Sequence, residues 1–347
     1  MFTVDEETGL SGAFGLGADV LQSRILLNLD SEDWGEIFIG CAGGKDTKAE
    51  FNYKKETIPA GMKTYKINVT GLKGGHSGDD IHKGLGNAVK ILNRILWELT
   101  LDFNIRISVI DAGNLRNAIA REGYATFAVS EAKGDSVIQK VKEYELVLKN
   151  ELAVNAPDLK VEIESVQTVD FLIDMNTQLN LLNALYACPH GVIAWSASIP
   201  GLVETSTNLA SVKTKETIVV GTSQRSSVES SLQDVVQMVQ ATFKLACASY
   251  ESSEGYPGWQ PNLDSEILRI ATNSYLRLFN QKPDVRAIHA GLECGLIGKK
   301  YPGMDMISFG PTVKGAHSPD ERLNIKTTQH FWDFTLDILK NIPNGKY

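Results

Sequence analysis

Residues 1–30 read MFTVDEETGLSGAFGLGADVLQSRILLNLD, which has a strand–helix–strand pattern. The apolar residues 1–4 predict a buried strand that runs straight into three acidic residues. A helix-like stretch over 12–22 follows, and a second apolar strand over 25–29 ends on Asp30. This order is the repeating unit of an α/β sheet, in which ligands bind beyond the carboxyl ends of the strands. Both acidic sites fall at such ends.

The pattern changes from about residue 45. Alternating apolar residues predict further strands, over 64–72, 103–110, 124–129, 161–166 and, as a pair, 208–222. Helical spacing predicts helices between them, over 81–99, 135–152, 178–186 and 232–247. Antiparallel strands with helices on one face are typical of an α+β domain. We therefore expect an inserted α+β domain.

A polar, turn-rich stretch at 249–258 predicts a hinge, after which a helix, a strand and a final helix restore the α/β character. The expected division is an α/β catalytic domain, with a mixed sheet and helices on both faces, interrupted by an inserted lid. Its first part is 1–44, the α+β lid is 45–249, and its C-terminal part is 250–347. Because a core strand at the start of the chain lacks neighbours, we expect this catalytic domain to be incomplete.

The composition is that of an ordinary globular protein, since 43% of the 347 residues are apolar and 22% are charged. The net charge of −8, from 34 basic and 42 acidic residues, comes without a basic stripe and argues against a nucleic-acid partner. The sequence shows neither a membrane span nor a signal peptide, so a cytoplasmic location is expected. The four cysteines form no CxxC motif, which indicates free thiols in a reducing compartment.

Candidate metal-site residues follow the strands of the α/β part. In the cluster Asp5-Glu6-Glu7, neighbouring side chains point opposite ways, so one carboxylate can bind a metal while the other takes the proton of a water molecule. Asp30 and His317 also follow strands, and carboxylates with an imidazole suit zinc. A solvated turn, a helix cap and a structural histidine are the alternatives for these three positions.

Three other polar residues each have a functional and a structural interpretation. His76 in GGHSG either stabilises an oxyanion or sits in a plain tight turn. Arg225 either clamps a substrate carboxylate or forms a surface ion pair, and Asn117 is equally ambiguous. The remaining candidates are interpreted as structural, exposed or packing residues: His82, His190, His330 and Trp259.

Long stretches of the chain resemble one known family. They are TVDEETGLSGAFGL, NLDSEDWGEIFIGCAGG, GLKGGHSGDDIHKGLGNA, LRNAIAREG, YPGWQP, IHAGLECGL and DMISFGPTVKGAHSPDE. Together they resemble the co-catalytic metallopeptidase superfamily of acetylornithine deacetylase, succinyl-diaminopimelate desuccinylase and carnosinase. Within it the chain is most similar to the aminoacyl-histidine dipeptidases.

The resemblance implies a role for each matching residue. Glu6 is the implied general base, and the implied ligands of two divalent metal ions are Glu7, Asp30 and His317. His76 polarises the scissile carbonyl from the lid, in many relatives across a subunit boundary, so a homodimer is expected. The implied substrate-binding residues are Arg225 and Asn117, at positions associated with the substrate carboxylate, and Glu293 and His289, in a loop that lines the site. Zinc is the expected metal, with manganese or cobalt as alternatives.

The chain departs from the family pattern at two places. Ala120 stands where the family usually has proline. The family also uses a His in an H-x-D motif and a bridging Asp upstream of the glutamate pair, whereas five residues precede Glu6 here. We therefore expect a truncated chain with a partial metal site. The expected reaction of the family is hydrolysis of a short unblocked dipeptide, of Xaa-His type. The alternatives are an N-deacylase or aminoacylase on the same scaffold, or an inactive fragment that binds a metal or a partner.

Overall fold

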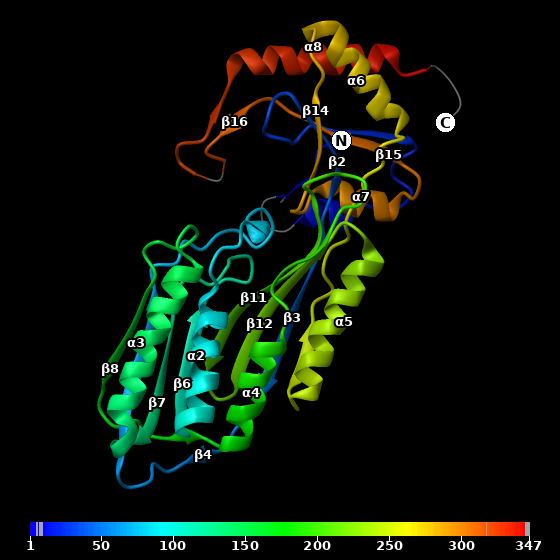
Figure 1. The fold of residues 1–347 in the computed structure, drawn as a ribbon. Helices are drawn as coiled ribbons and strands as arrows, with labels where there is room; N and C mark the ends of the chain where they lie inside the picture. Colours follow the sequence, from blue (N-terminus) through cyan, green and yellow to red (C-terminus); the bar gives the residue numbers. More distant parts are fainter. Residues whose placement is uncertain (5, 7–9, 317, 344–347) are drawn as a thin grey trace.

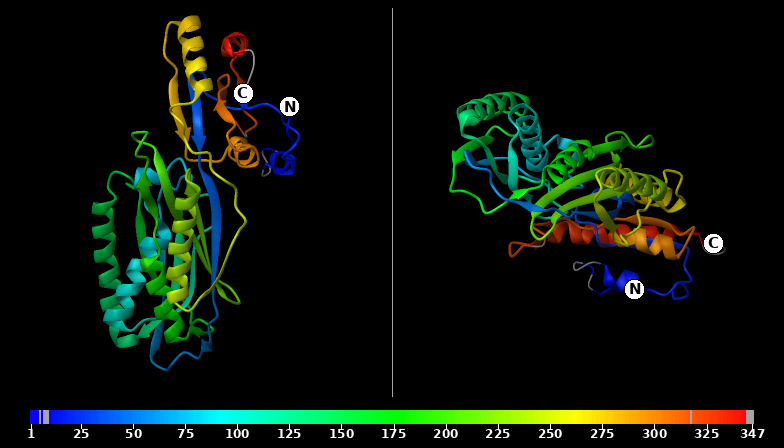
Figure 2. Two further views of the ribbon diagram at one scale, coloured as in Figure 1. Left: turned by 90° about the vertical axis from the view of Figure 1, so that its right-hand side faces the viewer. Right: turned by 90° about the horizontal axis from the view of Figure 1, so that it is seen from below.

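Two β-sheets lie end to end in the computed structural model, which describes residues 1–4, 6, 10–316 and 318–343 (Figure 1). The smaller sheet has the strand order β1-β15-β2-β14, and the nine-stranded sheet has the order β13-β3-β12-β11-β6-β7-β5-β8, with β10 beside β11. Strand β2 (Glu36–Cys41) belongs to the first sheet and β3 (Gly43–Phe51) to the second. Ala42 alone separates them, so the chain passes almost straight from one sheet into the other (Figure 2).

The smaller sheet is mixed and carries helices on both faces. Strand pairs β1–β15 and β2–β14 are parallel, whereas β15 and β2 are antiparallel. Ile307 and Phe309 pack with apolar residues of α6 and α8, while Met306 packs with Cys294 and Ile297 of α7 on the other face. The elements are β1 (Ile25–Asn28), β14 (Asp284–Ile288), β15 (Asp305–Ser308), α1 (Ser11–Gly15), α6 (Glu266–Phe279), α7 (Glu293–Lys300) and α8 (Ile325–Asn341). The predicted α/β architecture is confirmed.

The larger sheet is antiparallel throughout, and helices α2, α3, α4 and α5 cover one of its faces (Figure 1). Ile67, Ile107 and Phe127 are fully buried on adjacent strands and belong to one core with Leu92 and Leu96 of α2. The strands are β5 (Met62–Thr70), β6 (Arg106–Gly113), β7 (Gly123–Ser130), β8 (Lys160–Ser165), β10 (Gly191–Trp195), β11 (Val203–Thr214), β12 (Ile218–Ser226) and β13 (Ser249–Ser252). The helices are α2 (Ala88–Phe103), α3 (Gly134–Glu151), α4 (Met175–Ala187) and α5 (Glu229–Leu245). An α+β unit with helices on one face was the prediction, and it is confirmed.

Short elements complete the structure. They are two 3-10 turns, η1 (Ile81–Lys83) and η2 (Glu131–Lys133), the pair β4 (Lys55–Glu56) and β9 (Leu172–Ile173), and the hairpin of β16 (Val313–Lys314) and β17 (Arg322–Leu323). Among the described residues, none of the helices combines the length and the apolar character that a membrane span needs.

Several helices begin where a polar side chain caps the first turn. The Asn87 side chain accepts hydrogen bonds from Val89 N and Lys90 N at the start of α2. Ser265 caps α6 and Asn324 caps α8 in the same manner. Because a helix leaves its first backbone N–H groups without partners, such caps fix where each helix begins.

Three local predictions were wrong. Residues 1–4 form no strand, and Phe2 is fully exposed, because no described strand lies beside them to pair with. The helix expected over 12–22 is only α1 (Ser11–Gly15), in a stretch rich in glycine. The helix expected over 81–99 is split, since Gly84 adopts φ +64° and ends η1 before α2 begins. Glycine loses more conformational freedom than other residues in a helix and favours such breaks.

The predicted hinge at 249–258 is partly a strand. Ser249–Ser252 forms β13, which pairs with β3 at the edge of the larger sheet. The residues that follow return to the smaller sheet while pairing with the start of β3, since an isolated bridge joins Gly44 to Tyr256 and another joins Cys41 to Trp259. Both chain connections between the two sheets therefore run side by side.

Candidate active site at the junction of the two sheets

A row of four residues crosses the larger sheet where it meets the smaller one. Ser206 on β11 lies opposite Arg225 on β12, Arg225 lies opposite Gly44 on β3, and Gly44 lies opposite Tyr256. Residues directly opposite one another in an antiparallel sheet project to the same face. The row therefore presents Ser206, Arg225 and Tyr256 together on one side of the sheet.

A loop of the smaller sheet covers this row. His289 Nε2 lies 2.7 Å from Ser206 Oγ, and both residues are buried. A side chain at Gly78 would meet the carbonyl oxygen of His289 at 2.3 Å, so only glycine permits this approach of the GGHSG turn. Burial, together with the nearby charge of Arg225, lowers the pKa of His289 to about 4. His289 is therefore neutral at pH 7, and its Nε2 either accepts a hydrogen bond from the Ser206 hydroxyl or donates one to it, according to the tautomer.

Arg225 is the cation of the junction. Its side chain is buried, and its Nη1 donates a hydrogen bond to the Tyr256 hydroxyl at 3.0 Å. Its Nε is buried and donates to no group in the described part of the chain. A buried donor without a partner is costly. The guanidinium is therefore arranged to receive an anion.

His76 presents one ring nitrogen to the protein. Its Nδ1 lies 3.3 Å from an oxygen of Asp79 and also faces the backbone N–H groups of Gly78 and Asp79. The two backbone N–H groups favour the tautomer in which Nδ1 is an acceptor and the hydrogen lies on Nε2. In this tautomer Nε2 can donate a hydrogen bond. The hydrogen bond from His76 lowers the pKa of Asp79, so this carboxyl group stays ionised.

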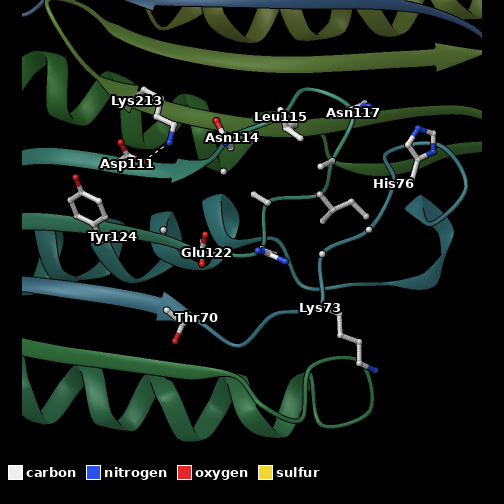
Figure 3. Close-up of a pocket in the computed structure, with 18 of the residues that line it drawn as sticks. Thr70, Lys73, His76, Asp111, Asn114, Leu115, Asn117, Glu122, Tyr124 and Lys213 are labelled. Carbon is white, nitrogen blue, oxygen red and sulfur yellow. Dashed lines mark hydrogen bonds and ion pairs between the residues drawn. The ribbon is translucent and has the colours of Figure 1, made fainter. Parts of the chain in front are cut away.

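Asn117 lies beside the same turn. Its carbonyl oxygen accepts a hydrogen bond from Ser77 N at 2.8 Å, and its side chain is exposed. A cavity of about 900 Å³ in the larger sheet begins at His76 and Asn117 and extends across β6, β7 and β5 (Figure 3). Among the described site residues, this cavity touches neither Asp30 nor Arg225. We therefore place the chemistry at the junction and not in the cavity.

A second group of polar residues lies at the start of α7. Glu293 is 8% exposed, and its Oε2 accepts a hydrogen bond from Thr3 Oγ1 at 2.9 Å. Its Oε1 is buried and has no hydrogen-bond partner among the described residues. Burial raises the pKa of Glu293, and the neighbouring charge of Asp30 raises it further. A buried carboxylate with the charge of the exposed Asp30 nearby suits a cation beside it.

The predicted metal set is only partly described. Asp30 lies near Glu293, and Glu6 is half-buried, with its carbonyl oxygen bonded to Leu10 N. Glu7 and His317 lie outside the described residues. Within the described part of the chain, no three His, Cys, Asp or Glu side chains gather closely enough to hold a metal ion. The observation that fits a bound cation is Glu293 Oε1, which is buried, has no partner within the described part of the chain and lies in reach of the Asp30 charge.

The structure adds four residues that sequence reasoning did not single out. Thr3, Asp79, Ser206 and Tyr256 each contact a predicted site residue. Asp79 follows His76 by three positions, a spacing at which a carboxylate can orient a histidine. Tyr256 lies in the YPGWQP stretch, of which only Trp259 was a candidate residue from the sequence. Ser206 carries no sequence signal, because only the pairing of distant strands brings it to His289.

The residues interpreted as structural are so in the described structure. His190 is held by Asn87 and by Leu209 N, and His330 packs against Trp34 and Phe279. Trp259 packs against the apolar cluster that contains Cys294 and Met304. All four cysteines are free thiols, and all but Cys247 are buried.

Comparison with known proteins identifies the family. Residues 59–156 match the model of the peptidase dimerisation domain. The chain is 43% identical over 344 residues to the cytosol non-specific dipeptidase of Escherichia coli (strain K12), covering 99% of this chain and 71% of that protein. It matches the crystal structure of aminoacylhistidine dipeptidase from Vibrio alginolyticus at 43% identity with a TM-score of 0.95, covering 99% and 70% of the two chains. The chain belongs to the M20 metallopeptidase family, in the branch of these dipeptidases.

Proposed function

We propose that the chain hydrolyses short unblocked dipeptides at the junction of the two sheets. The observation that carries the proposal is the convergence of Arg225, His289 and the His76 turn on one face, close to the loop that leads to Glu293. Both relatives named above are dipeptidases, which favours a dipeptide over the N-acyl substrate of a deacylase or aminoacylase. The name of the first relative supports a location in the cytosol.

In the proposed roles, residues from both sheets bind the substrate. Arg225, whose Nε has no partner among the described residues, binds the C-terminal carboxylate through charge-assisted hydrogen bonds. His76 Nε2–H donates to the scissile carbonyl oxygen, where negative charge develops. Asn117 lies beside the His76 turn, and its proposed partner is the carboxylate end of the substrate. Glu293 and His289 line the space between these groups.

Proton transfer is assigned to Glu6. Its carboxylate takes the proton of the attacking water and passes it to the nitrogen of the leaving amino acid, as a general base and then a general acid. Glu7, Asp30 and His317 are the proposed ligands of divalent metal ions, of which we propose two zinc ions. When bound, these ions supply an activated water at neutral pH. The oxygen ligands and the imidazole are donors that zinc accepts.

The proposed domains follow the same division. Residues 1–44 and 250–347 form the catalytic part, and 45–249 form the lid that brings His76 and Arg225 to it. The match of 59–156 to a dimerisation domain supports a homodimer. The His76 turn nevertheless packs on His289 of its own chain, so we propose that each site assembles within one chain.

The test is a hydrolysis assay with glycyl-histidine and with its N-acetyl derivative, in the presence of added zinc. We expect cleavage of the free dipeptide, loss of activity on adding a chelator, and loss in Glu6→Gln. The matched control is Glu143→Gln on the exposed face of α3, which should keep the activity of the parent. The zinc content of Asp30→Asn should be lower than that of the parent, and this measurement tests Asp30 as a metal ligand independently of turnover. No cleavage by the metal-loaded parent, or preference for the acetylated compound, would contradict the proposal.

A further inference from the structure

The position of Tyr256 relative to Arg225 points to a residue that acts through another. Arg225 and Tyr256 lie two strands apart in the row, with Gly44 between them. Two strand spacings amount to about 9.5 Å. The Tyr256 hydroxyl nevertheless accepts a hydrogen bond from Arg225 Nη1 at 3.0 Å. The tyrosine ring must therefore lie across the intervening strand.

Gly44 makes this arrangement possible. A Cβ atom built at Gly44 would lie 2.8 Å from both Cζ and the hydroxyl oxygen of Tyr256. The ring thus occupies the space that a side chain at the middle position of the row would fill. Backbone hydrogen bonds of 2.9 Å in both directions between Gly44 and Tyr256 fix the register.

A second glycine, Gly291, lies against the Tyr256 ring from the other side, so that Gly44 and Gly291 together form a slot for the ring. A Cβ atom at Gly291 would lie 2.8 Å from Cε2 of the same ring. Gly291 belongs to the loop that carries His289, whose ring contacts Ser206 at the other end of the row. The ring of Tyr256 is therefore held between the strand below and the loop above, and its hydroxyl has little freedom to move.

Nothing else in the described structure holds the Arg225 guanidinium with a comparable contact. No carboxylate of the described residues lies within ion-pairing distance of it, and its Nε has no partner there. An arginine side chain has several rotatable bonds, and fixing it before the ligand arrives reduces the entropy that binding must overcome. A hydroxyl acceptor fixes the guanidinium without neutralising its charge, as a carboxylate partner would.

We infer that Tyr256 is a positioning residue, which orients Arg225 so that the guanidinium meets the C-terminal carboxylate of the substrate. This inference rests on the proposed function, because it takes the carboxylate to be the ligand of Arg225. The slot formed by Gly44 and Gly291 is part of the same device. Tyr256 itself need not touch the substrate.

The experiment measures binding of glycyl-histidine and of its C-terminal amide to the metal-loaded chain by calorimetry, with Glu6→Gln as the background to prevent turnover. In the parent we expect the acid to bind at least about tenfold more tightly than the amide, since a buried charged pair is lost with the amide. Tyr256→Phe should weaken binding of the acid about fivefold and leave the amide unchanged. Gly291→Ala, which displaces the ring, should have the same selective effect. Tyr53→Phe is the control, because its hydroxyl bonds the Lys215 carbonyl far along the lid.

A double variant shows whether Tyr256 acts through Arg225. If it does, Tyr256→Phe should cost nothing further in an Arg225→Ala chain. Equal affinity of Tyr256→Phe and the parent for the acid, or equal loss for acid and amide, would overturn the inference while leaving the proposed function intact. If Arg225→Ala does not change the preference for the acid, or the parent binds neither compound, the proposed role of Arg225 fails and the inference fails with it.

Discussion

Acidification should destabilise the fold through His190, a histidine remote from the proposed chemistry. His190 is half-buried in the lid, where its Nδ1 accepts a hydrogen bond from Leu209 N at 3.3 Å and its ring lies beside the Asn87 amide. Burial, and then the charge of Lys90, lowers its pKa from 6.5 to about 4. Protonation in the folded state would remove the acceptor and place a second charge beside Lys90.

The sign follows from proton binding in the two states. Between pH 6.5 and about 4 the unfolded chain binds a proton at His190 that the folded chain does not. The free energy of unfolding therefore falls as the pH falls through this window. At pH 5, which is 1.5 units below 6.5, the loss from this one residue amounts to about 2 kcal/mol, at 1.36 kcal/mol for each unit.

The variant His190→Gln isolates this contribution. A glutamine oxygen can accept a hydrogen bond from Leu209 N, but the side chain does not titrate. Urea unfolding at pH 7.5 and pH 5, followed by circular dichroism, should show a stability loss about 2 kcal/mol smaller in His190→Gln than in the parent. The exposed His82→Gln is the control and should follow the parent. The same pH dependence in His190→Gln and the parent would refute the reasoning.

Three further predictions follow from single contacts. Lys90→Met should lower the free energy of unfolding by about 2 to 3 kcal/mol in urea titrations, because the ammonium group donates to three carbonyl groups at the end of α4, those of Leu185, Tyr186 and Cys188. Titration of the native chain with a disulfide reagent should modify one thiol rapidly, and Cys247→Ser should remove that phase, since the other three thiols are buried. Gly78→Ala should lower dipeptide affinity at least about tenfold in calorimetry, because the added methyl group would separate the His76 turn from His289.

The sequence predicted most long elements because their apolar periodicity is local. Helix α3 and strands β5 and β7 are found within a few residues of their expected bounds. Strands β2 and β14 were not predicted, although β2 lies inside the smaller sheet, between β15 and β14, and β14 forms its edge. The stretch 36–51 is interrupted only by Ala42, and no local pattern shows that its two halves pair with different sheets. That division depends on contacts with chain segments more than a hundred residues away.

In the candidate site, too, local sequence patterns do not show which residues long-range strand pairing brings together. Motif resemblance indicated His76 and His289, because the quoted stretches contain them, and it implied Arg225 by its matching position. Ser206 and Tyr256 become visible only through strand register, which places them on either side of Arg225 and Gly44. A serine in a strand and a tyrosine in a turn have ordinary structural explanations until that register is known.

The register also indicates how the lid can move. Both connections between the sheets, 41–44 and 256–259, are hydrogen-bonded to each other, so a rotation about this double connection would leave their four backbone bonds intact. The contacts that such a rotation must break lie elsewhere: the bond between His289 and Ser206, and the packing of Ile199 against the core of the smaller sheet. Tyr256 and Gly44 belong to the double connection, and Arg225 is one strand away. The hydrogen bond from Arg225 to Tyr256 and the contact of Tyr256 with Gly44 would therefore persist in an opened lid, whereas the Gly291 contact and the closure of His289 would not. Opening would expose a guanidinium that keeps its Tyr256 acceptor, and the return of the Gly291 loop would complete its positioning against the substrate carboxylate.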